Sequence, residues 1–200
     1  MKRGLLAGAV LFGLAGCATE NGGISIFTPK PDSAQDALEY YYDTIPDSAL
    51  PRAPAGLSLP ASDAVITKVL LASCLDEEKG PSAALMSLAS EQADLFLMVG
   101  DNVYGDRDGR AFVGNQPDLD EVRESFSDLA AREDFQNVRA THPMMVSWDD
   151  HDFGANDAGK EFPFRGYAER IHEVFWGLED EDVGHWPGTY YARSFGPEGQ

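Results

Sequence analysis

The stretch AVITKVLLASCLDEEKGPSAALMSLASEQADLFLMVGD, residues 64–101, decides the fold of this chain. Its two ends contain short apolar runs, residues 64–72 and 93–99, that are typical of buried strands. Between them, residues 81–91 have helical spacing, and Pro81 is predicted in the first turn of that helix. A strand, a helix and a second strand in this order predict a parallel β-α-β core and therefore an α/β fold.

The rest of the chain continues this pattern. We expect an amphipathic helix over residues 119–135, capped by Asp118, because its apolar side chains recur on one face. The Gly- and Asp-rich residues 102–117 are predicted to be a long functional loop. The other predicted elements are two strands, a helix and a short N-terminal helix: residues 143–148, 189–195, 162–178 and 36–42.

Composition limits the classes of partner. The chain has 200 residues, 15 Lys and Arg against 34 Asp and Glu, and a net charge of −19. One domain with appendages fits this length. The acidic balance argues against a nucleic-acid-binding surface, which would be basic. A phosphate-containing substrate would be repelled at long range, so any site for it needs bound cations that invert the local potential.

The N-terminus predicts export. Residues 1–17 combine Lys2 and Arg3 with a short apolar run and small residues, which is the pattern of a signal peptide. The ending Leu14-Ala15-Gly16-Cys17 resembles a bacterial lipobox, so we expect lipidation of Cys17 and location in the periplasm or cell envelope. An ordinary cleaved signal is the alternative. Residues 18–62 are interpreted as a tether and N-terminal extension, and residues 63–200 as the domain.

Polar side chains follow each predicted parallel strand, where ligands of open α/β sheets collect. They are Ser73-Cys74, Gly100-Asp101 and Asp149-Asp150-His151. Two carboxylates about 4 Å apart repel by roughly 4 kcal/mol at an effective dielectric near 20, so such a cluster favours a bound cation. A solvated acidic turn is the alternative, but two such turns at strand ends indicate one metal site.

The individual residue types refine this hypothesis. Tyr104 lies three residues after Asp101 and offers a second oxygen ligand, although a packed aromatic ring explains it as well. Cys74 is either a soft thiolate ligand or a buried small hydrophobic residue. His151 is predicted to be a ligand or a general acid. The remaining histidines are assigned surface or packing roles: His142, His172 and His185.

Three motifs carry a family resemblance: ASC at residues 72–74, DLFLMVGDNVYGD at residues 94–106, and SWDDHD at residues 147–152 with Asn156-Asp157 after it. In order and spacing they resemble the alkaline phosphatase D (PhoD-like) family of metallophosphoesterases. The resemblance implies a layered α/β/β/α sandwich, of which residues 63–200 supply the N-terminal half.

The same resemblance implies roles for single residues. The implied metal ligands, around an iron(III) and calcium centre, are Cys74, Asp101, Tyr104 and Asp150. His151 corresponds to the histidine that contacts the phosphoryl group or protonates the leaving oxygen. Asn156 is expected to bind substrate. Asp149 competes with Asp150 as the ligand, because the doubled Asp leaves the register open.

The expected function is metal-assisted hydrolysis of a small phosphomonoester or phosphodiester outside the cytoplasm. Relative to the family the chain is truncated, since it stops at Gln200 before a second sheet with further ligands. The alternative is a non-catalytic surface lipoprotein that binds calcium through Asp106, Asp108 and Asp152. Calcium takes oxygen ligands and has no use for a thiolate, so Cys74 discriminates between the two.

Overall fold

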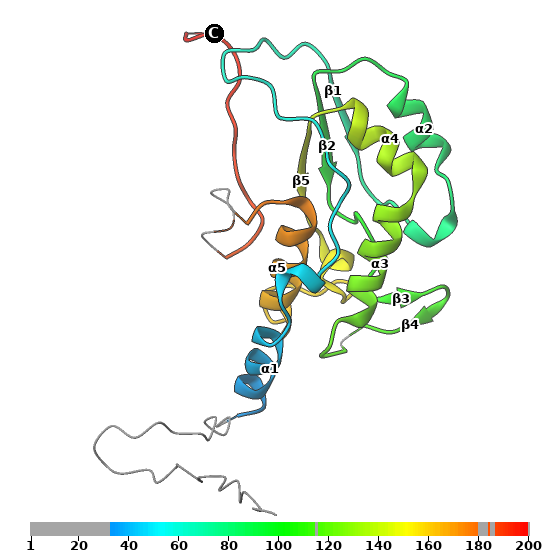
Figure 1. Ribbon diagram of the computed structural model, residues 1–200, viewed down its shortest axis with the longest axis vertical. Helices are drawn as coiled ribbons and strands as arrows, with labels where there is room; N and C mark the ends of the chain where they lie inside the picture. The colour runs from blue at the N-terminus through cyan, green and yellow to red at the C-terminus, as the bar shows by residue number, and fades with distance from the viewer. Residues whose placement is uncertain (1–32, 115, 180–183, 185–186, 200) are drawn as a thin grey trace, which may run out of the picture.

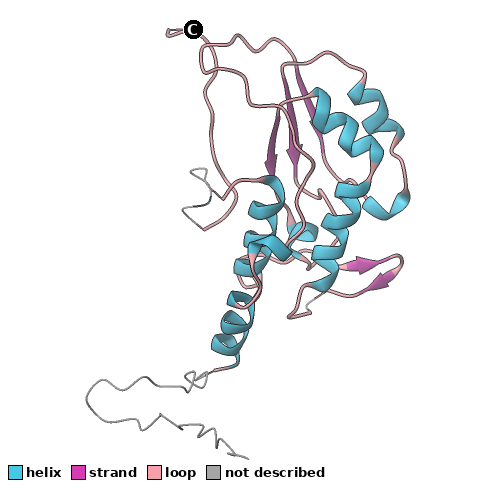
Figure 2. Ribbon diagram, in the orientation of Figure 1, coloured by secondary structure: helices cyan, strands magenta, loops and turns pink. Residues whose placement is uncertain are grey.

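The computed structural model describes residues 33–114, 116–179, 184 and 187–199. Within them, five α-helices accompany a parallel sheet, a small hairpin and three short 3-10 helices (Figures 1 and 2). The helices are α1 (Ala34–Asp43), α2 (Ala83–Ala89), α3 (Asp120–Ala131), α4 (Glu133–Thr141) and α5 (Arg165–Trp176). The strands are β1 (Val69–Ala72), β2 (Leu95–Val99), β3 (Arg107–Asp108), β4 (Ala111–Phe112) and β5 (Met144–Ser147). The 3-10 helices are η1 (Asp47–Ala49), η2 (Glu77–Lys79) and η3 (Asp150–Phe153).

The main sheet has the order β1-β2-β5, with every strand parallel to its neighbour. Phe96 in the central strand lies opposite Leu70 on one side and Met144 on the other. The helix α2 connects β1 to β2. The α/β class and the parallel β-α-β core predicted from the sequence are therefore confirmed.

The two faces of the sheet differ in burial. Leu70, Phe96, Met98, Met144 and Val146 point to one face and belong to the core. Figure 1 shows α2 and α4 on one side of the sheet, and their buried residues share this core. On the opposite face, Leu71 is 63% exposed, and Val69 and Val99 are exposed as well. This face of the sheet is therefore only partly covered within the described part of the chain, with Leu95 buried and Leu71 exposed.

The helix predicted over residues 119–135 is wrong in its extent, because the chain breaks at Arg132 into α3 and α4. Arg132 is extended, and its guanidinium binds the buried Asp134 carboxylate at 2.7 Å. The same carboxylate accepts a hydrogen bond from the Ser82 backbone N–H at 2.6 Å. This buried pair stabilises the break over a continuous helix. The predicted Asp118 cap is also wrong, because Leu119 occupies the N-cap position in a left-handed conformation without a side-chain cap.

Three boundaries differ for local reasons. Residues 64–68 are not in β1, because the Asp94 side chain accepts the backbone N–H groups of Thr67 and Lys68 at 2.7 and 3.0 Å. Pro81 precedes α2 and is not in its first turn, since Ser82 is the N-cap. The loop predicted over residues 102–117 contains the β3–β4 hairpin.

The strand predicted over residues 189–195 is absent from the described part of the chain. The outer edge of β5 is instead met by side chains. The Val146 N–H donates to the Tyr191 hydroxyl at 3.0 Å, and the Trp148 N–H donates to Thr189 Oγ1 at 3.4 Å. These contacts use edge positions where a backbone ladder would form.

Residues 33–53 pack against α5. The Tyr42 ring stacks on Tyr167 with centroids 4.2 Å apart, and Leu50 joins the core. The Ala53 N–H donates to the Phe175 carbonyl at 2.8 Å. Of the three consecutive tyrosines in α1, Tyr42 is buried, whereas Tyr40 and Tyr41 are exposed. Among the described residues, none of the helices has the length and apolar character needed to span a bilayer.

Candidate metal centre

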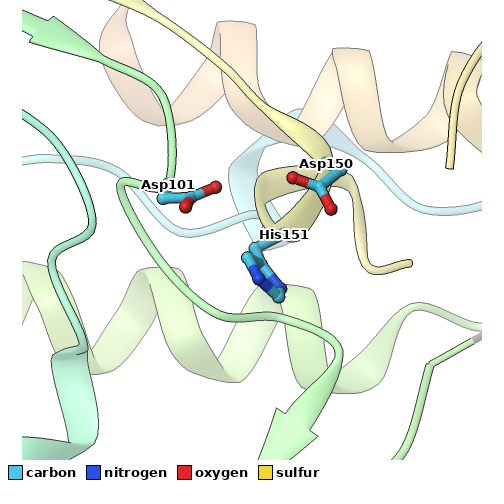
Figure 3. Close-up of side chains that lie close together, drawn as sticks. All are labelled: Asp101, Asp150 and His151. Carbon is cyan, nitrogen blue, oxygen red and sulfur yellow. The ribbon is translucent and has the colours of Figure 1, made fainter. Parts of the chain in front are cut away.

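The carboxyl ends of β2 and β5 bring three titratable side chains together (Figure 3). Asp101 follows β2, and Asp150 and His151 begin η3 shortly after β5. Each offers one potential ligand atom, and these atoms lie within 4.8 Å of one another. Parallel neighbours end at the same edge of a sheet, which is why residues 49 or more positions apart along the chain meet here.

Cys74, at the end of β1, lies beside this cluster. Its Sγ is 3.4 Å from Asp101 Oδ2, and the residue is exposed. The Leu75 N–H donates to the Asp101 carbonyl at 2.8 Å, which ties the β1 end to the β2 end. Of the two interpretations of Cys74, the buried hydrophobic one is wrong.

The backbone at this edge is unusual. Cys74 and Asp101 have φ of 57° and 46°, in the left-handed region that side chains rarely adopt. Between β2 and Asp101, Gly100 has φ of 96°, and a Cβ added there would lie 2.6 Å from the Asp149 Cβ. Only glycine fits this close approach of the two turns. Backbone strain held by its surroundings is a recurrent property of functional sites.

Tyr104 packs against the same centre. Its ring centroid lies 4.3 Å from that of His151, and the Arg107 guanidinium carbon lies 3.9 Å from the Tyr104 ring centroid. Burial raises the pKa of Tyr104, and the neighbouring Asp101 and Cys74 add to this rise. A bound cation acts in the opposite direction, because it favours the phenolate.

Asp149 and Asp150 differ in their contacts. Asp149 is exposed and caps η3, its side chain accepting the Asp150 N–H at 3.0 Å. Asp150 points into the cluster with Asp101 and His151 (Figure 3). One of its oxygens also accepts the Asp157 N–H. The structure therefore places Asp150, and not Asp149, in the cluster.

Asp152 connects the turn after β2 with the turn after β5. It is fully buried, and it accepts the backbone N–H groups of Asn102, Val103 and Asp149 at 2.8, 3.2 and 2.9 Å. Burial raises the pKa of Asp152 to about 8, although these N–H donors lower it. Sequence reasoning missed this role. The signal was the spacing of Asp149 and Asp152, which form a capping box across η3.

His151 and Asn156 share one partner, Asp106. Its Oδ1 lies 2.8 Å from His151 Nδ1, and its Oδ2 accepts the Asn156 backbone N–H at 3.1 Å. The Asn156 side chain is exposed and donates to Asp157 Oδ2 at 2.7 Å. Asn156 therefore lies next to the site, and its substrate-binding role stays a prediction.

The cluster has unsatisfied negative charge. Asp101 Oδ1 is buried and has no hydrogen-bond partner among the described residues. Burial raises the pKa of Asp101, and Asp150 and Asp149 raise it further, whereas Cys74 and His151 lower it. A buried carboxylate oxygen without a donor is destabilising unless a cation binds it. The donor set, with carboxylate, imidazole, thiol and phenol groups, fits a transition-metal ion.

Two other histidines have packing roles. His142 and His172 are buried, with 1% and 0% of their surfaces exposed. His142 Nε2 contacts the Glu91 carbonyl at 3.0 Å, and His172 packs against the rings of Phe126 and Trp148. Both agree with the predicted surface or packing roles. Cys17 and His185 lie outside the described residues.

Comparison with known proteins finds similarity to one family. The family model described as PhoD-like phosphatase matches residues 69–163. Alkaline phosphatase D of Bacillus subtilis (strain 168) is 28% identical over 151 residues, covering 70% of this chain and 26% of that protein. A solved structure titled "Structure of PhoD" superposes with a TM-score of 0.51 at 20% identity, over 68% of this chain and 30% of the other. This chain thus corresponds to between a quarter and a third of these relatives.

PhoD-like phosphatases are metal-dependent, which agrees with the cluster of Asp101, Asp150 and His151. Residues 69–163 therefore match part of a PhoD-like phosphatase domain.

Proposed function

We propose that this protein is a metal-dependent phosphoric ester hydrolase that acts on phosphomonoesters or phosphodiesters. The observation that carries the proposal is the buried, unpartnered Asp101 Oδ1 in a cluster with Asp150 and His151. Asp101, Asp150, Cys74 and Tyr104 would hold the ions, with iron(III) and calcium as the proposed pair. When bound, such ions supply Lewis-acid polarisation of the phosphoryl oxygens.

The protein's own residues have distinct parts in this proposal. Asp101 and Asp150 would be the anionic ligands of the ions. The positive charge of the bound ions would then allow an acidic protein to bind an anionic ester. His151 is next to both carboxylates and is the proposed group that contacts the phosphoryl group or protonates the leaving oxygen. Gly100 lets the turn of Asp101 approach the turn of Asp150 closely enough for one site.

Variants of these residues test the proposal. The assay is hydrolysis of a chromogenic phosphomonoester and diester with iron and calcium supplied. Asp101→Asn and Asp150→Asn should lose both metal and activity, whereas His151→Asn should retain metal and lose turnover. Asp128→Asn, on the exposed face of α3, is the control and should behave as the unmodified protein. Full activity in Asp101→Asn would refute the site.

The proposed iron(III) has an optical signature. A tyrosinate bound to iron(III) gives a charge-transfer band in the visible spectrum, and calcium alone gives none. Tyr104→Phe should remove the band and preserve the fold, because the ring still packs on His151. A band of unchanged intensity in Tyr104→Phe would mean that Tyr104 is not a ligand.

The alternative, a calcium-binding lipoprotein without catalysis, is less well supported by the contacts. Two of its three carboxylates, Asp106 and Asp152, are 1% and 0% exposed and accept hydrogen bonds from the protein. The thiol of Cys74 contacts Asp101 in the cluster. Cys74→Ser separates the two functions, because it should impair a hydrolase and leave calcium binding unchanged.

Export and anchoring are a further part of the proposal and are supported by the N-terminal sequence. The lipobox-like Leu14-Ala15-Gly16-Cys17 supports the proposal that Cys17 is lipidated and begins the mature protein, in the periplasm or cell envelope. Mass spectrometry of the mature N-terminus should find an acylated Cys17. A free thiol at Cys17, or cleavage elsewhere, would remove the anchor.

A further inference from the structure

We propose that Asp106 is a positioning residue that fixes the orientation and the ring tautomer of His151. Only the expected effect of Asp106 on catalysis rests on the proposed function. Its structural basis is the 2.8 Å contact between Asp106 Oδ1 and His151 Nδ1. Asp106 is 1% exposed, so this contact is shielded from water.

The chemistry of the two groups assigns the proton. An ionised carboxylate can only accept a hydrogen bond, so in the neutral imidazole the ring proton must lie on Nδ1. The lone pair is then on Nε2, the ring nitrogen that does not contact Asp106. Histidines that serve metal or phosphoryl chemistry depend on this assignment, because it decides which nitrogen is available to the site.

Asp106 is itself held rigidly. Its second oxygen accepts the Asn156 backbone N–H at 3.1 Å, and its carbonyl accepts the Val113 N–H at 2.8 Å. The neighbouring Gly105 N–H donates to the His151 carbonyl at 3.1 Å. The Gly105 and Asn156 bonds join the loop after β2 to η3 and to the residues just after it, and the Val113 bond closes the end of the β3–β4 hairpin.

The His151 ring is restrained by two contacts. The Tyr104 ring lies 4.3 Å from it, centroid to centroid, and Asp106 holds its Nδ1. Rotation of the imidazole would break the Asp106 bond, so loss of the carboxylate should release both the tautomer and the orientation. Asp108, two residues later in the hairpin, is exposed and provides a matched acid for comparison.

The first test reads the tautomer directly. The full chain, labelled with 15N at histidine, is studied by NMR in buffer containing calcium and no iron, which keeps the spectrum diamagnetic. His151→Gln identifies the His151 signals by their disappearance. We expect the Nδ1–H form in the unmodified protein and in Asp108→Asn, and a mixture or the Nε2–H form in Asp106→Asn. The same tautomer in Asp106→Asn, or an Nε2–H form in the unmodified protein, would overturn the inference.

The second test separates positioning from folding through a double-mutant comparison in the metal-loaded protein. Asp106→Asn should lower kcat by roughly 10- to 100-fold with little change in KM, a loss typical of groups that orient ligands. In a His151→Gln background the same substitution should have no further effect, because Asp106 acts through His151. Independent, additive losses would contradict the proposal. Because the NMR test needs no turnover, it remains decisive for Asp106 even if the proposed hydrolase activity is absent.

Discussion

Replacement of Asp152 should be among the most damaging single changes near the candidate site, although its side chain is fully buried beneath it. Asp152 accepts N–H groups both from the loop after β2 and from the turn after β5. Removing it should both lower the free energy of unfolding and weaken metal binding, because the Asp101 and Asp150 turns lose a shared support.

The magnitude follows from the three accepted hydrogen bonds. A buried donor left without a partner is destabilising by about 1–3 kcal/mol. Asp152→Ala leaves three such N–H groups, those of Asn102, Val103 and Asp149, so we expect a loss of about 3 kcal/mol or more. Asp152→Asn keeps an oxygen for Asn102 and Val103 but turns an NH2 group toward the Asp149 N–H. Its expected loss is that of about one bond, roughly 1–3 kcal/mol.

Urea unfolding followed by circular dichroism measures these losses by linear extrapolation. Asp128→Asn, which is exposed on α3, should change the free energy of unfolding by no more than about 0.5 kcal/mol. Binding of iron and calcium to each variant is measured in parallel. A loss below about 1 kcal/mol in Asp152→Ala, or equal losses in the Ala and Asn variants, would show that Asp152 does not support the two turns.

Two further predictions concern the core. Burial lowers the pKa of His172 to about 3, below the unfolded value near 6.5, so the neutral ring stabilises the fold above about pH 6.5 and this stability is lost as the pH falls toward 3. His172→Leu should flatten that acid limb in unfolding curves measured from pH 3 to 7; an unchanged limb would exclude His172 as its source. On the sheet, Leu70→Ala should destabilise by about 2–5 kcal/mol and Leu71→Ala by no more than about 0.5 kcal/mol in urea unfolding, because their exposed fractions are 9% and 63%. Similar losses for both would mean that the Leu71 face is covered in solution.

The sheet and the approximate position of the site were predictable because both depend on short-range patterns. Apolar runs identified the strands β1, β2 and β5, and polar residues directly after them identified the edge where Cys74, Asp101 and Asp150 meet. Because the last residue of a strand determines the position of the next few residues, the strand ends also predicted where these polar side chains lie. The roles assigned to these residues remain predictions for the experiments above.

Other features depended on contacts between residues far apart in the chain. The break at Arg132 results from the hydrogen bond between Asp134 and Ser82, 52 residues earlier. The spacing of apolar residues along the helix cannot predict a contact at this distance in the sequence. The missing strand near residue 191 has a similar origin, since the Tyr191 side chain bonds to the edge of β5. Such tertiary contacts override local propensity because a buried ionic hydrogen bond is stronger than the preference of a few residues for a helix or strand.

The acidic residues around the site divide into two groups by their partners, which the sequence could not separate. Asp106, Asp149 and Asp152 accept hydrogen bonds from the protein at the ends and base of the two turns. Asp101 and Asp150 also have one protein contact each, with Cys74 and with the Asp157 N–H, but Asp101 keeps a buried oxygen without any partner among the described residues, and Asp150 lies beside it in the cluster. In sequence all five are equivalent carboxylates in Asp-rich turns. The first group positions the backbone and His151, and this leaves the second as the carboxylates available to a cation. The clustered carboxyl groups are thus tolerated because three of the five accept backbone N–H groups at the base and ends of the turns, and the other two lie where an ion can bind.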